Sequence, residues 1–203
     1  MSAHPPTFGL ILAGGLGRRL GGVDKALVAV GGRTVLERVT ARLVPQVAAL
    51  ALNANGDPAR FGDALPVMPD PLPDRPGPLA GVLAGLDEIA RRGGDWLLTV
   101  PADCPFLPVD LVSRLHAQRA DHPIACAVSA GRHHPVIALW PARLRGPLRA
   151  ALEGGERRVG VWAGEQGSAR VAWPATPYDP FLNINTAEDL AAAEAIAAAY
   201  PDA

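Results

Sequence analysis

A glycine-rich segment near the start of the sequence holds the residues best suited to bind a charged ligand. Its sequence is Leu12-Ala-Gly-Gly-Leu-Gly-Arg-Arg-Leu-Gly-Gly-Val-Asp-Lys25. Glycines let the backbone approach a polyphosphate closely and point N–H groups toward it. Arg18, Arg19 and Lys25 add positive charge. The segment favours polyphosphate binding over its alternative, a surface turn with solvated cations.

Two well-known phosphate loops do not account for this segment. A P-loop ends in Gly-Lys-Ser/Thr, whereas Lys25 lies between Asp24 and Ala26. The dinucleotide pattern G-x-G-x-x-G, started at Gly15, would need a glycine where the chain has Leu20. The segment therefore indicates a phosphate loop of another type.

Asp103 is the candidate metal ligand of the sequence. It lies in Val100-Pro-Ala-Asp-Cys-Pro105, directly after an apolar run. A carboxylate just past a buried strand can hold Mg²⁺ beside a bound triphosphate. Alone, such an aspartate more often caps a helix or closes a turn. In combination with the glycine-rich segment, Asp103 is predicted to bind Mg²⁺.

The elements that must position these residues alternate along the chain. Strands are predicted over Thr7–Ala13, Ala48–Asn53, Trp96–Val100, Ile124–Ser129 and Val136–Trp140. Helices are predicted from the capping-box sequence at Thr34 with Leu36, Val39, Leu43 and Val47 on one face, over Leu79–Arg92, from Pro108 to about Ala120, and from Thr186 to Tyr200. The alternation predicts a three-layer α/β/α sandwich with a mostly parallel sheet.

Polar motifs follow these strands repeatedly: at Gly14, Asn53, Asp70 and Asp103. In open α/β sheets, ligands bind outside the carboxyl ends of the strands. We therefore expect these motifs to meet at one edge of the sheet. The proline-rich stretch 57–78 is predicted to be a long loop over that site.

Composition excludes several other classes of protein. The net charge is −1, with no basic footprint for nucleic acid. The two cysteines, Cys104 and Cys126, suit neither a zinc site nor a disulfide framework and are expected to be small buried residues. The apolar run Phe8–Ala13 is too short for a signal peptide or a membrane span. We expect a soluble, cytoplasmic protein without nucleic-acid or membrane partners.

Seven short motifs occur along the chain in the order found in one known family. Each motif is weak alone, but the ordered set is specific. On these motifs, the chain resembles the molybdenum cofactor guanylyltransferases over residues of about 7–195. The motifs are Leu12–Lys25, Asn53-Ala-Asn55, Asp70, Gly77-Pro-Leu-Ala-Gly81, Pro101-Ala-Asp103, Gly155-Glu-Arg-Arg158 and Asn183-Ile-Asn-Thr186.

The resemblance implies a nucleotide-diphospho-sugar transferase-like fold and transfer of GMP from GTP to molybdopterin. The products would be molybdopterin guanine dinucleotide and pyrophosphate, and the cofactor would be Mg²⁺. It implies a single nucleotidyltransferase domain over 1–203, with a nucleotide-binding half at about 7–105 and an acceptor-binding half at about 106–203. Molybdoenzyme apoproteins or chaperones are candidate partners.

The resemblance also assigns roles to individual residues. Those expected to bind GTP are Leu12, Ala13, Gly14, Gly15, Lys25, Asn53, Asp70 and Asp103. Lys25 would neutralise the phosphates and Asp103 would bind Mg²⁺. Apart from the resemblance, the charge of Arg19 makes it a candidate to assist the leaving pyrophosphate. Gly81, Asn183 and Asn185 match the side that receives molybdopterin.

Three alternatives to this function remain open. Related cytidylyltransferases have Leu-Ala-Ala-Gly where this chain has Leu12-Ala-Gly-Gly15, a one-residue difference that favours GTP over CTP. A sugar phosphate is another candidate acceptor. A GTP- or molybdopterin-binding adaptor could dispense with Asp103, so its presence together with Lys25 favours an enzyme.

Several further residues have a structural interpretation beside a functional one. Adjacent His133 and His134 on a strand would point to opposite faces, which favours a surface or loop-lining role over a metal pair. Arg157 and Arg158 could meet the pterin phosphate or form a solvated helix end. Trp140, Trp162 and Trp173, at strand-like spacing, are expected to be core or partner-facing residues rather than stacked on the pterin.

Overall fold

A mixed β-sheet forms the centre of the molecule. The computed structural model describes residues 4–14, 24–72 and 77–203, and within them seven strands form one sheet in the order β5-β4-β1-β6-β8-β7-β9. Their bounds are β1 Thr7–Leu12, β4 Ala49–Asn53, β5 Val67–Met68, β6 Trp96–Pro101, β7 Ile124–Ser129, β8 Arg132–Pro141 and β9 Ser168–Trp173. Neighbouring strands are parallel except at β8, which is antiparallel to both β6 and β7. The prediction of a mostly parallel sheet is confirmed.

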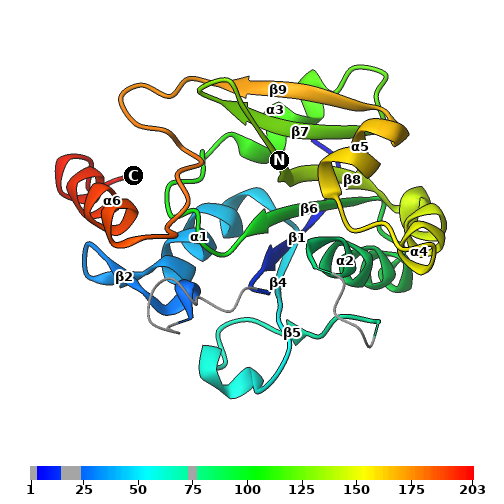
Figure 1. Cartoon of the computed structure of the whole chain (residues 1–203), viewed down its shortest axis with the longest axis horizontal. Helices are drawn as coiled ribbons and strands as arrows, with labels where there is room; N and C mark the ends of the chain where they lie inside the picture. The colour runs from blue at the N-terminus through cyan, green and yellow to red at the C-terminus, as the bar shows by residue number, and fades with distance from the viewer. Residues whose placement is uncertain (1–3, 15–23, 73–76) are drawn as a thin grey trace.

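Helices cover both faces of this sheet (Figure 1). One face packs against α1 (Val35–Leu43), α3 (Leu111–Gln118) and α6 (Ala187–Ala199), and the other against α2 (Pro78–Arg92), α4 (Arg145–Glu153) and α5 (Val159–Gln166). Successive residues of β1 divide between the two cores: Ile11 faces α1, whereas Leu10 and Leu12 face α2. This arrangement is the predicted three-layer α/β/α sandwich.

Shorter elements complete the described part of the chain. They are the hairpin of β2 (Ala29–Val30) and β3 (Arg33–Thr34) and the short helices η2 (Lys25–Leu27), η3 (Val44–Gln46), η4 (Pro58–Phe61) and η5 (Ala142–Leu144). The proline-rich stretch predicted as a loop contains η4 and the short edge strand β5.

The capping boxes predict the helix starts well. Thr34 Oγ1 accepts from Glu37 N at 3.1 Å, and Thr34 N donates to Glu37 Oε2 at 2.7 Å, so α1 begins where expected. The same reciprocal pair joins Thr186 and Asp189 at the start of α6.

The predicted extension of α1 as far as Val47 is wrong. Helix α1 ends at Leu43, because Pro45 has no N–H group to continue its hydrogen bonds.

Other boundaries differ from the sequence prediction as well. Helix α3 begins at Leu111 rather than Pro108, because the residues between them form a turn closed by Leu111 N and Pro108 O at 3.3 Å. Strand β8 begins at Arg132, four positions before the predicted Val136. The strand-like environment expected for Trp162 is wrong, since this residue lies on α5.

The strand register aligns the ends of three strands at one edge of the sheet. Leu12 pairs with both Asn53 and Pro101. The pairing continues one step beyond the strands, where Ala13 N donates to Asn53 O at 2.8 Å and Ala102 N donates to Leu12 O at 3.0 Å. The segments after β1, β4 and β6 therefore leave the sheet side by side, as the motif positions predicted.

Candidate active site

The centre of the site is an ion pair between Lys25 and Asp103. Lys25 Nζ lies 3.3 Å from Asp103 Oδ2, and the same ammonium group donates to Asn185 Oδ1. The two charged side chains are only 21% and 17% exposed. Asp24 caps η2 through its Oδ1, which accepts from Ala26 N at 3.2 Å, and so fixes the backbone from which Lys25 extends.

Asp103 is held in place from both its backbone and its side chain. It lies two residues after the end of β6. Its carbonyl oxygen accepts from Ile184 N at 3.0 Å, and its Oδ1 accepts from Asn183 Nδ2 at 3.1 Å. Burial raises the pKa of this carboxyl group, while Lys25 beside it acts in the opposite direction. Burial thus makes the ionised form of Asp103 costly, and a further positive charge at this position would stabilise it.

The amide of Asn183 has a fixed orientation. Its Nδ2 donates to Asp103, and its Oδ1 accepts from Cys104 Sγ at 3.4 Å. Burial raises the pKa of the Cys104 thiol well above its usual value, so the thiol stays protonated and can donate. Cys104 and Cys126 are both buried, as predicted. The contribution of Cys104 to the site was missed, because two cysteines that suit neither a zinc site nor a disulfide framework suggest only packing.

A second polar cluster lies at the end of β4. Asn53, only 4% exposed, donates from Nδ2 to Met68 O and to Asp70 Oδ1, both at 3.1 Å. Asn55 Nδ2 donates to Asp70 Oδ2 at 2.7 Å, and Asp70 N donates to Asn55 Oδ1 at 3.0 Å. The structure thus brings the predicted Asn53 and Asp70 together and adds Asn55, whose i, i+2 spacing from Asn53 was the available signal.

Gly81 packs beneath this second cluster. It is buried on α2, and a Cβ at this position would clash with Asn53 Oδ1 and lie 2.8 Å from Leu12 Cδ2. Gly81 thus contacts the residues at the ends of β1 and β4. Along the same edge Leu12 is buried, Ala13 is half-buried and Gly14 is exposed. The predicted site residues Gly15 and Arg19 lie outside the described part of the chain.

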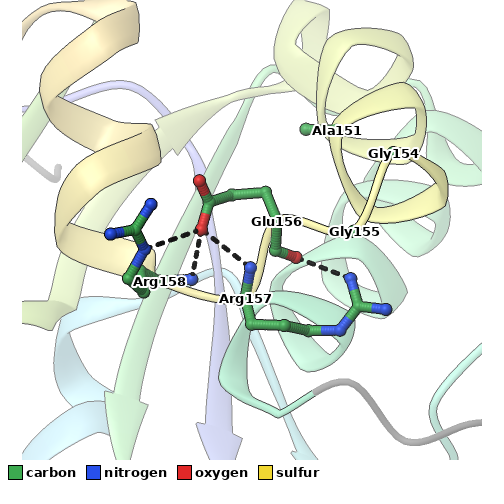
Figure 2. A pocket seen from close by; sticks show the side chains of 6 residues that line it. All are labelled: Ala151, Gly154, Gly155, Glu156, Arg157 and Arg158. Carbon is green, nitrogen blue, oxygen red and sulfur yellow. Dashed lines mark hydrogen bonds and ion pairs between the residues drawn. The ribbon is translucent and has the colours of Figure 1, made fainter.

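The two arginines of the Gly155–Arg158 motif line an open hollow of about 540 Å³ before α5 (Figure 2). Glu156 Oε1 accepts from the backbone N–H groups of Arg157 and Arg158 at 2.8 Å and from Arg158 Nε at 3.3 Å. Arg157 Nη1 donates to Leu152 O and Glu156 O, each at 2.8 Å. Bonds to the backbone thus hold the guanidinium group of Arg157 at the end of α4.

The tryptophans and the adjacent histidines considered in the sequence analysis pack against other side chains of the fold. Trp140, Trp162 and Trp173 are buried, which confirms the prediction that they belong to the core. His133 and His134 are half-buried at the start of β8, and His134 lines the connection after β9 through its contact with Phe181. Residues 4–14, 24–72 and 77–203 contain no group of three or more His, Cys, Asp or Glu side chains placed to hold a metal ion.

This geometry agrees with the similarity of the sequence to known proteins. The family model of the MobA-like NTP transferase domain matches residues 9–167. The chain belongs to this family. A molybdenum cofactor guanylyltransferase of Rhodopseudomonas palustris is 57% identical, covering 97% of each chain. One from Nitrobacter hamburgensis is 54% identical, covering 96% of each.

Solved structures share the fold of this MobA-like NTP transferase domain. The molybdopterin-guanine dinucleotide biosynthesis protein A of Archaeoglobus fulgidus superposes with a TM-score of 0.72 at 22% identity, covering 95% of this chain and 99% of that one. The 4-diphosphocytidyl-2C-methyl-D-erythritol synthase of Anaerococcus prevotii gives 0.72 at 13% identity, covering 94% and 95%. The fold is therefore that of the nucleotidyltransferases. No helix in the described part of the chain is long and apolar enough to cross a membrane.

Proposed function

We propose that this MobA-like NTP transferase transfers GMP from GTP to molybdopterin, with or without bound molybdenum, and forms molybdopterin guanine dinucleotide and pyrophosphate. The observation that carries the proposal is the convergence of Lys25 and Asp103 with Asn183 and Asn185 at the carboxyl edge of the sheet. Support also comes from the relatives that are named molybdenum cofactor guanylyltransferases and are 50–57% identical over nearly their full length.

The two polar clusters suit the two substrates. The backbone of Leu12–Gly14, with Gly15, would carry the nucleotide phosphates, and the cluster of Asn53 and Asp70 would contact the base and ribose. Residues of about 7–105 then form the nucleotide-binding half. Asn183 and Asn185 would belong to an acceptor-binding half of about 106–203. Asn185 contacts Lys25, and Asn183 contacts Asp103.

The reaction requires charge neutralisation more than proton transfer. The terminal phosphate of molybdopterin attacks the α-phosphorus of GTP in line, a new P–O bond forms, and the bond to the β-phosphate breaks. A phosphate monoester is a competent nucleophile near neutral pH, so no strong base is needed. Lys25 would offset the charge that develops on the phosphates, and Arg19 would assist the departing pyrophosphate. Fixed charges of this kind are preorganised for the transition state.

Asp103 fits a Mg²⁺ ligand in this scheme. Mg²⁺ is commonly held by one or two carboxylates together with substrate phosphates and waters, so a site with a single carboxylate is adequate. The raised pKa of Asp103, caused by burial, marks a carboxylate that a nearby cation would stabilise. Asp103 would hold the ion, which when bound would supply positive charge that offsets the charge of the nucleotide phosphates. Asn183 would keep Asp103 oriented through its bond to Oδ1.

We place this reaction in the cytoplasm, where the product would pass to molybdoenzyme apoproteins or chaperones. The two buried cysteines, Cys104 and Cys126, are not paired with each other, which fits a reducing compartment.

Pyrophosphate release tests the function and its alternatives in one assay. The protein would be incubated with molybdopterin, Mg²⁺ and GTP, CTP or ATP in turn, with Lys25→Ala as the matched inactive control. Release with GTP, strongly reduced in the variant, is expected. Release with CTP alone would contradict the guanylyl assignment. GTP binding without release in any mixture would favour an adaptor over an enzyme.

A further inference from the structure

The connection between β9 and α6, residues 174–186, carries both asparagines of the site. Its C-terminal end is fixed by Asp189, whose Oδ2 accepts from Asn185 N at 2.9 Å and from Thr186 N at 3.0 Å. Its middle is fixed by Asp179, whose Oδ1 accepts from Ser129 Oγ at 2.6 Å and from Phe181 N at 3.0 Å. The asparagines therefore lie between two aspartate anchors.

The bonds around Ser129 have a definite direction. Ser129 ends β7 and is only 1% exposed. Its single hydroxyl proton is donated to Asp179 Oδ1, so its oxygen must accept from His134 Nε2 at 2.9 Å. His134 therefore carries a proton on Nε2, and the chain of donors runs from His134 through Ser129 to Asp179. Hydrogen bonds to a carboxylate are among the stronger ones, and low solvent exposure strengthens them further.

Phe181 connects this chain to the active site. Its side chain is 1% exposed, with its ring centroid 5.1 Å from that of His134 and 5.3 Å from that of Trp173. Its carbonyl oxygen lies 3.8 Å from Cys104 Sγ, the sulfur whose thiol donates to Asn183 Oδ1 at 3.4 Å. Asn183 is only two residues further along the chain, so a displacement of Phe181 would move it directly.

We propose that Asp179 and Ser129 are positioning residues that hold Asn183 and Asn185 against Asp103 and Lys25 during GMP transfer. Neither residue is assigned contact with a substrate, and their effect on turnover rests on the proposed function. The nucleotide cluster of Asn53 and Asp70 is tied to the ends of β4 and β5 and shares no hydrogen bond with this chain of donors. Loss of the anchor should therefore affect transfer rather than GTP binding.

The kinetic test compares Asp179→Ala with two reference variants. Asp179→Asn keeps an oxygen that can accept from Ser129 and Phe181. Asp110→Ala is the matched control, because Asp110 Oδ1 accepts from Trp173 Nε1 at 3.0 Å just before the same connection but away from the asparagines. We expect Asp179→Ala to lower kcat about 10- to 100-fold, the scale of an ångström-sized misplacement, with KM for GTP changed less than about twofold. Asp179→Asn and Asp110→Ala should keep near-normal kcat.

A readout independent of activity separates this inference from the function. In ¹H–¹⁵N spectra, the side-chain amide signals of Asn183, assigned with Asn183→Asp, should shift or broaden in Asp179→Ala and stay in place in the two reference variants. Should Asp179→Ala fail to fold, Ser129→Ala removes the same donor while leaving the bond from Phe181 N intact. It is expected to give a smaller change in the same direction.

Each combination of results decides between the two proposals. If wild type releases no pyrophosphate but the Asn183 amide moves, the proposed function fails and the anchor stands. If wild type is active and neither kcat nor the amide responds to loss of Asp179 or Ser129, the positioning inference is overturned. A fall in kcat without movement of the amide, or without rescue by Asp179→Asn, would overturn it as well.

Discussion

Replacing Gly81 by alanine places a methyl group where helix α2 meets the ends of β1 and β4. The new Cβ would clash with Asn53 Oδ1 and lie 2.8 Å from Leu12 Cδ2. Asn53 cannot move away freely, because it is 4% exposed and its amide donates to Met68 O and Asp70 Oδ1. We therefore expect Gly81→Ala to disturb the nucleotide cluster and to destabilise the fold.

The size of the effect follows from three contributions. Overpacking a close contact costs about 1–3 kcal/mol. Loss of the two Asn53 hydrogen bonds costs about 1 kcal/mol each. Alanine has a better helix propensity than glycine and so stabilises α2 by about 1 kcal/mol. The expected fall in the free energy of unfolding is therefore about 2–4 kcal/mol, and displacement of Asn53 should raise KM for GTP about tenfold or more, equivalent to about 1.4 kcal/mol.

Gly85→Ala is the matched control for this experiment. It lies one turn further along α2, and its Cβ would lie 2.7 Å from both Leu97 methyl groups and 2.9 Å from Leu10 Cδ2. These neighbours are core side chains, so this variant should lose stability without a change in KM for GTP. The assays are urea unfolding, and pyrophosphate release with each substrate varied in turn.

Two results would refute the reasoning about Gly81. The first is a raised KM for molybdopterin with KM for GTP unchanged, which would place Gly81 on the acceptor side as the family resemblance implies. The second is additivity between Gly81→Ala and Asn53→Ala in unfolding free energy. If the added methyl group acts through Asn53, the double variant must be more stable than the sum of the single effects predicts.

Three further predictions concern the centre of the site, the nucleotide cluster and the fold. Asp103→Asn keeps the bond from Asn183 but removes the negative charge beside Lys25, so its turnover should fall about 10²- to 10³-fold; unchanged turnover in the folded variant would contradict the role assigned to Asp103. Asn55→Ala removes both bonds to Asp70 and should raise KM for GTP about tenfold at unchanged kcat; equal KM values would show that Asp70 holds its position unaided. Burial, with the charges of His4 and Arg119, lowers the pKa of His116 from 6.5 to about 4, so the unfolded chain takes up the proton first as pH falls. Between pH 7 and 5, the free energy of unfolding of wild type should fall by up to about 2 kcal/mol more than that of His116→Gln. Urea midpoints that change with pH equally in the two proteins would contradict this.

Much of the fold can be predicted from the sequence because its signals are local. The capping sequences at Thr34 and Thr186 determine two helix starts, and short, mainly apolar runs mark β1, β4 and β6. The elements that were missed lack such signals: the strands β2, β3, β5 and β9, the helices α4 and α5, and the short helices η2, η3, η4 and η5. Strand β5 has two residues inside a proline-rich stretch, and the buried positions of β9 include small Ala169, which weakens its alternation.

The candidate site could be predicted in its residues but not in its contacts. The alternation of strands and helices predicts a parallel sheet, and the carboxyl ends of parallel strands lie at one edge of the sheet. Gly14, Asn53 and Asp103 each follow a predicted strand, so they are expected at that edge. The bond from Lys25 to Asn185 spans 160 positions of the chain, and no periodicity in one sequence encodes it. The contacts of Cys104 with Asn183 and of Ser129 with Asp179 could not be predicted for the same reason. The two residues of each pair are far apart in the sequence and come together only in the complete fold.

The fate of the individual phosphates of GTP tests the central claim most directly. Wild-type protein would be incubated with molybdopterin, Mg²⁺ and GTP labelled at either the α- or the γ-phosphate, and the products would be separated and counted. Attack on the α-phosphorus predicts that the α-label enters the dinucleotide and the γ-label leaves as pyrophosphate. Appearance of the γ-label in the pterin product, or absence of the α-label from it, would contradict GMP transfer by this protein.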